Sequence, residues 1–441
     1  MTSSNEPSLN RDVVFTGIGL VTPLGLGAAA SWQALLNGET AGRLLTTTDI
    51  DHFQPLCDLL QRVPGGAPVD HAALDSRLHQ QLAADAVGRH VLESFGTDCL
   101  NRMMLASVIE ALDDADLPRH TCAGDPRMAC VIGTSKGSLR AMEQEVQALR
   151  LRTDLPQQHW PNSFLPDAPL HCVRQFLNAT GPSFCPVAAC ATGLVSVIQA
   201  AALIRHGFAD VCVAGSVDAS LRASVLAAFH RLGVTSKHTN PATACRPFDR
   251  DRDGFVIGEG AAALILESAE HAARRMATTY GRFVGGCWLT DPTGLTQVDT
   301  SGGIVREAIC RLYGSKRNDT VPDVISLHGT GTPTNDLAEA RGIASYYGPS
   351  APPGFGIKGA MGHLLGAAGS VELAMTLLAL RHGIIPATAG HVSVDPKCEI
   401  PLLQQTRTTP LNSALKLSLG FGGHVAACQI DTTCQFRHST T

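Results

Sequence analysis

Short apolar runs alternate with longer helical segments along most of the chain. A short run that is apolar on both faces is typical of a strand inside a sheet that helices cover. We therefore predict strands at Asp12–Gly17, Met128–Gly133, Val211–Gly215, Ala261–Glu267, Val324–Leu327 and Ala414–Leu419, with a return strand near Val425–Ile430. The alternation predicts an α/β fold with helices on both faces of a parallel or mixed sheet.

Two of the intervening segments have almost no polar face. In Gly193–Arg205 and Ser370–His382 apolar residues surround the axis, a pattern that predicts helices buried on all sides within a body of several layers. Thr46–Gly96, by contrast, is richer in Pro, Asp, His and Gln and predicts surface excursions. Gly420–Gly423 predicts a glycine turn between the last two strands.

The composition narrows the class of protein. The 441 residues are 44% hydrophobic and only 5% aromatic, which excludes a disordered or fibrous chain. A net charge of −5 gives no general electrostatic footprint for nucleic acid or an anionic membrane. No apolar run reaches the ~20 residues of a membrane span, and the N-terminus lacks a secretory pattern. We therefore expect a soluble, cytoplasmic protein without a nucleic-acid or membrane partner.

The 14 cysteines are scattered singly, without a C-x-x-C pair or zinc-ligand spacing, and we expect most to be reduced core residues. Cys190 differs, because Ala188–Gly193 places it among small residues at the start of a buried helix. Unpaired N–H groups and the helix dipole would lower the pKa of a thiol there and make it nucleophilic. The alternative is a packed cysteine in a tight turn.

Two histidines stand beside glycines at the ends of buried elements. His328 follows a predicted strand and opens His328–Thr332, and His363 lies five residues after Lys358 at the start of a predicted helix. With Cys190 they predict a Cys/His/His centre. A lone histidine in such a place is more often structural, and we leave the remaining histidines as structural or surface residues.

Two segments suggest cofactor sites only superficially. Asp249–Phe255 evokes a calcium loop but lacks the later bidentate glutamate and alternates arginine with carboxylates, so we predict a salt-bridged loop. Gly17–Thr22 lacks the third glycine of a dinucleotide fingerprint. We predict neither a metal nor a nucleotide site.

A serine hydrolase is an alternative from a different class. Gly133–Gly137 fits the G-x-S-x-G elbow, with Ser135 as its nucleophile and Asp336 and His363 following in the required order. This interpretation leaves Cys190 without a role.

Six ordered motifs resemble those of the β-ketoacyl synthases, the condensing enzymes of fatty acid and polyketide synthesis. They are Val13–Gly25, Gly181–Gly193, Cys245–Gly260, His328–Thr332, Lys358–Gly369 and Gly420–Gly423. The resemblance covers nearly the whole chain and implies a thiolase-like fold, in which two related βαβ halves form α-β-α-β-α layers. It implies a flexible N-terminus over 1–11, a half carrying the nucleophile over 12–268, and a half carrying the histidines over 269–441.

The resemblance also assigns roles. Cys190 would accept an acyl chain from an acyl carrier protein as a thioester. His328 and His363 would promote decarboxylation of malonyl carrier protein and stabilise the enolate, which then attacks the thioester. Backbone N–H groups of Cys190 and Phe421 would form the oxyanion hole, and Phe421 would gate between the two half-reactions.

Supporting positions follow from the same resemblance. Thr330 and Thr332 would hold the pantetheine arm, and Lys358 and Glu339 would form an orienting ion pair behind the histidines. The implied partners are an acyl carrier protein and a second copy of the chain in a homodimer, with no cofactor. The candidate docking residues for the carrier are Arg102, Arg140 and Arg231.

Two departures from the family pattern concern the acyl group. Leu417–Val425 lacks two asparagines and a phenylalanine that the family commonly has, which predicts an altered gate. Lys136 stands at the far end of the implied acyl pocket, where an unpaired amine is costly. Either Lys136 finds a partner or turns aside, or the acyl group is short or polar.

We predict an elongating synthase whose substrate is something other than a long saturated acyl chain. The alternative is a non-catalytic or chain-length-determining partner subunit. The presence of Cys190 argues against this alternative.

Overall fold

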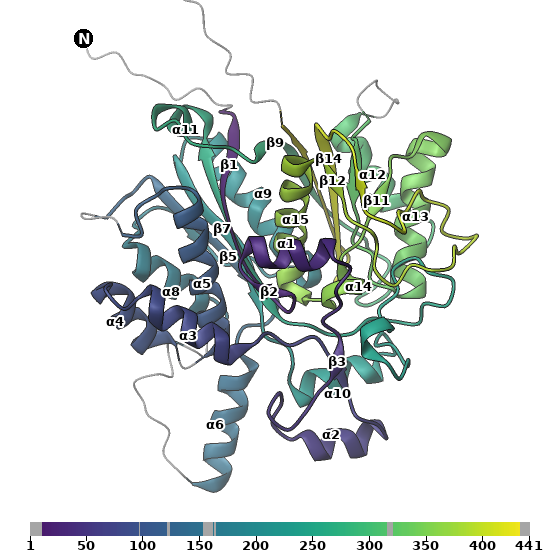
Figure 1. Cartoon of the computed structure of the whole chain (residues 1–441), viewed down its shortest axis with the longest axis horizontal. Helices are drawn as coiled ribbons and strands as arrows, with labels where there is room; N and C mark the ends of the chain where they lie inside the picture. The colour runs from purple at the N-terminus through teal and green to yellow at the C-terminus, as the bar shows by residue number, and fades with distance from the viewer. Residues whose placement is uncertain are drawn as a thin grey trace, which may run out of the picture.

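The predicted apolar runs form strands of one mixed sheet (Figure 1). The structure is a computed structural model in which residues 11–96, 98–120, 124–152, 162, 165–314 and 321–432 are described. The strand order is β11-β10-β14-β15-β9-β1-β8-β7-β5-β6, and β2 pairs with β1. The bounds are β1 Val13–Thr22, β2 Gly25–Leu26, β5 Met128–Thr134, β6 Ser183–Phe184, β7 Val211–Asp218, β8 Gly260–Ser268, β9 Gly281–Thr290, β10 Val324–Ser326, β11 Gly354–Phe355, β14 Ser413–Gly420 and β15 His424–Asp431.

The strand order repeats in the two parts of the chain. β5 is parallel to β6 and β7, and β7, β8 and β1 are antiparallel neighbours. In the same way β10 is parallel to β11 and β14, and β14, β15 and β9 are antiparallel neighbours. The two sets meet where β1 pairs with β9. The boundary between 268 and 269 stays a prediction, and residues 1–10 and 433–441 of the predicted segments lie outside the described residues.

Two apolar helices fill the middle layer and contact each other and strands of both sets. They are α9, Thr192–Arg205, and α15, Ala368–His382. Their crossing is close, because a Cβ at Gly193 would lie 2.3 Å from a backbone nitrogen of α15, and one at Gly369 would lie 2.6 Å from a backbone nitrogen of α9. Only glycine permits this approach. Cys190 and His363 precede these helices closely, so the crossing holds their two segments together.

Outer helices complete the layers (Figure 1). On one side α5 packs on β1 and β8, and α8 packs on β5; on the other side α12 packs on β9 and β15, and α13 packs on α12. Their bounds are α5 Cys99–Asp114, α8 Ala168–Leu177, α12 Gly303–Tyr313 and α13 Pro333–Tyr347. This arrangement confirms the predicted α-β-α-β-α layers. Among the described residues, no helix combines the length and apolar character needed to span a membrane.

The stretch predicted as surface excursions contains three helices. They are α2 Phe53–Leu60, α3 His71–Gln81 and α4 Ala86–Phe95. Asp70 and Asp85 cap α3 and α4 by accepting backbone N–H groups, and α3 buries Leu74 and Leu78. The sequence did not predict these helices, because each is attached to the body by one narrow apolar face and its other residues are mostly polar.

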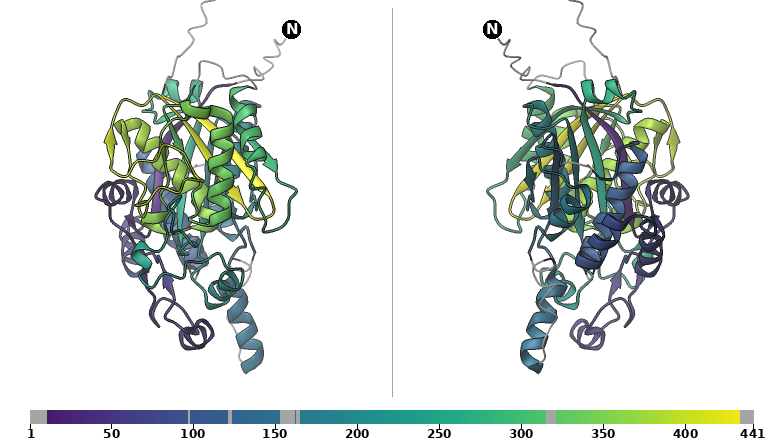
Figure 2. Two further views of the ribbon diagram at one scale, coloured as in Figure 1. Left: turned by 90° about the vertical axis from the view of Figure 1, so that its right-hand side faces the viewer. Right: turned by 90° about the vertical axis from the view of Figure 1, so that its left-hand side faces the viewer.

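Several shorter elements surround this body. They are α1 Ala28–Leu36, α6 Leu139–Leu151, α10 Ala223–Arg231, α11 Ala269–Arg274, α14 Lys358–Met361 and the strand pairs β3 Arg43–Leu44 with β4 Gly65–Gly66 and β12 Ile384–Ile385 with β13 Arg407–Thr408. Figure 2 shows α6 projecting away from the layers.

Candidate active site

A cavity opens where the ends of the predicted motifs meet. Cys190, His328 and His363 all line it, so the structure brings together the three residues predicted as one centre. Phe421 lines the same cavity from the turn between β14 and β15, and Thr330 lines it from the loop after β10.

Cys190 lies in a 3-10 turn that runs directly into α9. The preceding Ala189 has a φ of 47°, a strained value for a residue with a side chain, so the surrounding structure must hold the turn. The backbone N–H of Phe421 donates a hydrogen bond to Cys190. The nucleophile candidate therefore has a fixed position beside the glycine turn.

The predicted lowering of the thiol pKa is wrong for the resting protein. Burial raises the pKa of Cys190 to about 11, although the nearby ammonium groups of Lys358 and Lys136 act in the opposite direction. Removing the sulfur from water disfavours its charged form more than these groups stabilise it. Cys190 is thus a thiol at neutral pH.

His328 follows β10 and is held through its backbone. The carboxylate of Glu339 on α13 accepts the N–H of His328 at 2.6 Å and that of Gly329 at 2.9 Å. Burial raises the pKa of Glu339 to about 7, and these two hydrogen bonds oppose the rise. Glu339 therefore orients the loop that carries the histidine.

His363 lies just after α14 and is likewise held through its backbone. Its N–H donates to the carbonyl of Val256 at 2.7 Å, and its own carbonyl accepts from Gly258 at 3.0 Å. The ring packs edge-on against Phe255, with 4.9 Å between ring centroids. These contacts leave the ring with little freedom to turn.

The two histidine rings lie nearly perpendicular, with centroids 5.5 Å apart and an angle of 81°. The Nδ1 atom of each faces a donor: Nζ of Lys358 lies 3.2 Å from that of His328, and the N–H of Leu365 lies 3.2 Å from that of His363. A neutral ring whose Nδ1 accepts carries its hydrogen on Nε2. Burial first, and then the charge of Lys358, lower the pKa of both histidines well below the usual value.

The predicted ion pair between Lys358 and Glu339 is wrong. Lys358 forms its ion pair with Glu372 on α15 and also donates to the carbonyl oxygen of His328. No ion pair between Lys358 and Glu339 is found among the described residues; the oxygens of Glu339 accept the backbone N–H groups of His328 and Gly329 instead. Both residues still support His328, Lys358 through the ring and the backbone carbonyl, and Glu339 through the backbone N–H.

Thr330 and Thr332 face the cavity together, with their hydroxyl oxygens 2.9 Å apart. The buried carboxylate of Asp336 accepts the N–H groups of Thr330 at 3.0 Å and of Gly331 at 3.1 Å. Asp336 also accepts the N–H of Phe248 at 2.7 Å. This carboxylate therefore fixes the loop that follows His328.

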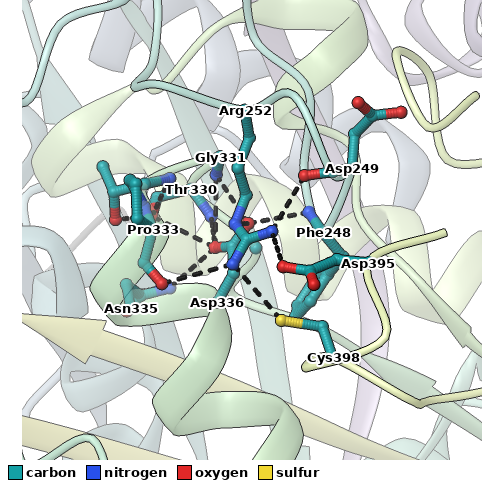
Figure 3. Close-up of polar contacts among 12 residues, drawn as sticks. Phe248, Asp249, Arg252, Thr330, Gly331, Pro333, Asn335, Asp336, Asp395 and Cys398 are labelled. Atoms are coloured by element: carbon teal, nitrogen blue, oxygen red, sulfur yellow. Dashed lines mark hydrogen bonds and ion pairs between the residues drawn. The ribbon is translucent and has the colours of Figure 1, made fainter. Parts of the chain in front are cut away.

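Arg252 compensates the charge of Asp336 (Figure 3). Its Nε lies 3.6 Å from Asp336, its Nη1 donates to Asp395 at 2.6 Å and its Nη2 contacts the sulfur of Cys398 at 3.3 Å. Together with an ion pair of 2.9 Å between Arg246 and Asp249, these contacts confirm that the segment from residue 249 is a salt-bridged loop.

No group of three or more His, Cys, Asp or Glu among the described residues could hold a metal ion.

The glycine turn places Phe421 beside the nucleophile candidate. Gly422 and Gly423 have φ values of 82° and 77°, which residues with a side chain rarely adopt. The ring of Phe421 stacks on that of Phe229 at 6.2 Å between centroids. The N–H of Gly422 donates to the carbonyl of Leu295 at 2.7 Å, so the turn is also attached to the loop after β9.

Lys136 has a partner. Its Nζ lies 3.2 Å from the buried carboxylate of Asp218 and donates to the hydroxyl of Ser220 at 2.7 Å. Asp218 also accepts the N–H of Gly366 at 3.1 Å, three residues after His363. Of the possibilities left open for Lys136, the structure shows a compensated ion pair.

The serine hydrolase alternative is not supported by the geometry. The hydroxyl of Ser135 donates to Asp218, and Asp336 bonds to the loop at Thr330. Among the described residues no hydrogen bond joins Ser135 or Asp336 to His363, so these three residues do not form a triad.

Family profiles match most of the chain. The one described as "Beta-ketoacyl synthase, N-terminal domain" matches residues 10–272, and the one described as "Beta-ketoacyl synthase, C-terminal domain" matches residues 293–391. The chain belongs to the β-ketoacyl synthase family. This membership confirms the resemblance that the six motifs indicated.

Curated relatives and a solved structure match the chain over nearly its whole length. The mitochondrial 3-oxoacyl-[acyl-carrier-protein] synthase of Arabidopsis thaliana is 34% identical, with 96% of this chain and 93% of the relative covered. The ketoacyl synthase alpha subunit of the tetracenomycin polyketide synthase of Streptomyces glaucescens is 32% identical, with 95% and 96% covered. A solved type II PKS ketosynthase in complex with its acyl-carrier protein has a TM-score of 0.82 at 26% identity, with 96% of this chain and 100% of that chain covered. The fold of the chain is thiolase-like, as predicted.

Two charged residues around the site were missed by the sequence interpretation. Glu372 and Lys416 are buried behind the histidines. A charged residue inside an otherwise apolar run is the signal that could have identified Glu372 and Lys416. Their partners could not be read from the chain, because they lie on other elements.

Proposed function

We propose that the protein is an elongating β-ketoacyl-acyl carrier protein synthase. The observation that carries the proposal is the meeting of Cys190, His328 and His363 in one cavity beside the N–H of Phe421. A thiol, two Nε2–H donors and a backbone donor are the groups that a decarboxylative Claisen condensation needs. We propose no metal or nucleotide cofactor.

The first half-reaction is acyl transfer to Cys190. The sulfur attacks the thioester carbonyl of an acyl carrier protein, the carbon–sulfur bond to pantetheine breaks, and the thiol proton passes to the departing pantetheine sulfur. The N–H groups of Phe421 and Cys190 would stabilise the oxyanion between these steps. The pKa of about 11 means that the thiol must lose its proton during attack.

The second half-reaction is decarboxylation followed by condensation. The Nε2–H groups of His328 and His363 donate to the thioester carbonyl of malonyl carrier protein. The bond to the carboxylate then breaks, carbon dioxide leaves, and the electron pair of the broken bond forms the enolate. The enolate carbon bonds to the acyl carbon, the bond from that carbon to the sulfur of Cys190 breaks, and the departing thiolate takes up a proton from water to restore the thiol. Hydroxyls of Thr330 and Thr332 would hold the pantetheine arm.

The partners that we propose are an acyl carrier protein and a second copy of the chain. The solved ketosynthase with its carrier protein supports the first. For carrier docking we favour Arg231, which is exposed, over Arg102, which already pairs with Asp75 at 3.1 Å. For the homodimer, β6 ends the sheet and carries Phe184, and Val187 follows shortly after it; the two residues are 51% and 54% exposed.

We propose that the acyl substrate is short or carries a polar end. The altered gate over Leu417–Val425 supports this. The ion pair of Lys136 with Asp218 removes the cost of an unpaired amine, but it still places two charges at the position that corresponds to the far end of the acyl pocket in the family. The alkyl end of a long saturated chain would displace water from the two charged groups, and it could not replace the hydrogen bonds that the water makes.

The test of the proposed function is formation of an acyl adduct and its extension. The protein is incubated with a short acyl carrier protein, and intact mass should rise by the acyl group; addition of malonyl carrier protein should then yield the product longer by two carbons. Cys190→Ala should abolish the adduct. An adduct that persists in this variant would overturn the assignment of the nucleophile.

A second candidate is a non-catalytic, chain-length-determining partner subunit. The same experiment separates the two, because a folded protein that neither gains the adduct nor releases carbon dioxide from malonyl carrier protein would favour the partner subunit. The presence of Cys190 and both histidines in one cavity favours catalysis.

A further inference from the structure

Lys416 is a buried charge that the proposed reaction does not use. It lies in β14 with 0% of its side chain exposed. Burial lowers its pKa, and the carboxylates of Glu372 and Glu339 oppose this effect. Because an ammonium away from water is costly unless it is paired, its presence at this point needs a physical reason.

Oxygen atoms surround the ammonium of Lys416. Its Nζ lies 2.7 Å from Oε2 of Glu372 and donates to the carbonyl oxygen of Leu417. It also reaches the carbonyl oxygen of Leu327 at 3.5 Å. These contacts take the place of the water molecules that the ammonium has lost.

The same oxygens belong to the segments that carry the reactive groups. Leu327 immediately precedes His328. Leu417 lies on the strand that leads into the turn of Phe421. Glu372 belongs to α15, which begins shortly after the second histidine. A single side chain therefore connects the supports of both histidines and of the oxyanion turn.

Glu372 is shared between two buried lysines. Its Oε1 pairs with Lys358 and its Oε2 with Lys416. Since Lys416 holds one oxygen, the carboxylate is kept in the orientation that presents the other oxygen to Lys358, whose Nζ lies 3.2 Å from Nδ1 of His328. Loss of Lys416 would free the carboxylate to turn, and small displacements of orienting groups are enough to reduce rates.

We propose that Lys416 is a positioning residue for the decarboxylation half-reaction. It fixes Glu372 and, through Lys358, the tautomer and placement of His328. The inference rests on the proposed function. Acyl transfer to Cys190 does not require this tautomer, so loss of Lys416 affects the two half-reactions unequally.

The experiment compares three substitutions of Lys416 with a matched control. Lys416→Met removes the charge at similar length, Lys416→Gln removes the charge but keeps a donor, and Lys416→Arg keeps the charge. Lys397→Met alters an exposed lysine instead. Two rates are measured for each full-length variant: acyl adduct formation on Cys190 by intact mass, and carbon dioxide release from malonyl carrier protein. The melting temperature reports folding.

The expected result is a selective loss. Decarboxylation falls at least about tenfold in the methionine and glutamine variants, and acylation changes by less than about threefold. The arginine variant recovers most of the decarboxylation rate, and the control keeps both rates.

Three results would overturn the proposal. The first is an unchanged rate of decarboxylation in a folded neutral variant. The second is an equal loss of both half-reactions with a lowered melting temperature, and the third is failure of both neutral variants to fold. The second and third results would assign Lys416 to stability alone. An unaltered protein that forms no adduct and releases no carbon dioxide would instead overturn the proposed function, so the two failures remain distinguishable.

Discussion

The ammonium of Lys358 lies 3.2 Å from Nδ1 of His328, and an ammonium can only donate. This nitrogen must therefore accept, and the hydrogen of the neutral ring sits on Nε2. Leu365 imposes the same tautomer on His363 through its N–H. In the proposed function the two rings would act as hydrogen-bond donors toward a substrate carbonyl, and protonation is not needed for this role.

The histidine tautomers predict a flat pH profile for decarboxylation. Burial and Lys358 lower the pKa of His328 and His363 well below the usual value of about 6.5. A histidine with a lowered pKa stays neutral as the pH falls through that value, so the rate should be nearly constant from about pH 8 to about pH 6. The measurement is carbon dioxide release from malonyl carrier protein across this range. A loss of activity with an apparent pKa near 6.5 would contradict it.

The buried thiol predicts slow alkylation that accelerates with pH. Because burial raises the pKa of Cys190 to about 11, the thiolate fraction grows steadily as the pH rises toward that value. The rate of carbamidomethylation by iodoacetamide should therefore still rise between about pH 8 and about pH 10. Cys190→Ala provides the background from other cysteines, and a plateau below about pH 9 would show that the thiol is activated at rest.

Removing the charges of the ion pair between Lys136 and Asp218 should shift the preference of the protein toward long saturated acyl groups. In the double variant Lys136→Leu with Asp218→Asn, two neutral side chains replace the ion pair without leaving a charge unpaired. We expect the ratio of long to short saturated acyl transfer onto Cys190 to rise at least about tenfold, because an alkyl end then meets no solvated charge. Lys136→Arg should keep the original ratio. Long saturated acyl groups that already react as fast as short ones in the unaltered protein would count against the predicted specificity.

Loss of Arg252 should destabilise the protein strongly. Its side chain is 5% exposed and pairs with Asp336 and Asp395, so Arg252→Met leaves buried carboxylates uncompensated and should cost about 3 kcal/mol of unfolding free energy. Arg250 lies in the same loop with a side chain that is 63% exposed, and Arg250→Met should cost less than about 1 kcal/mol. Urea unfolding measures both, and equal effects would refute the expected difference.

If two copies of the chain pair through β6 at the end of the sheet, a charged residue on β6 should prevent dimer formation. Phe184 on β6 is 51% exposed beside an end strand, and Phe184→Glu places a charge where a second copy would pair. We expect the unaltered chain to be a dimer by light scattering and the variant to be a monomer at the same concentration. Phe208→Glu alters another exposed phenylalanine, 62% exposed, and should leave the dimer intact. A dimer in both variants would place the interface elsewhere.

The three residues that meet in the cavity could be predicted from the sequence because their neighbours are informative. Small residues around Cys190 and glycines beside His328 and His363 signal close approach of backbone and ligand. The burial of the helices α9 and α15 could be predicted equally well, because a helix without a polar face is stable only when protein surrounds it.

The charged supports could not be predicted, because pattern alone does not identify partners. Lys358 pairs with Glu372 rather than Glu339, and the difference depends on how α14, α15 and α13 are placed in three dimensions. Lys416 interrupts a strand that the apolar pattern assigns to the core, and its partners lie on two other elements and on its own strand. The sign of the pKa shift of Cys190 likewise depends on burial, which local sequence does not specify.

The crossing at Gly193 and Gly369 has a mechanical consequence. The nucleophile candidate precedes one helix and a histidine precedes the other, and the contact between them has no room for a methyl group. The two parts of the chain are therefore locked together directly behind Cys190 and His363. We expect this contact to keep the spacing between sulfur and imidazole constant when loops at the cavity rim move.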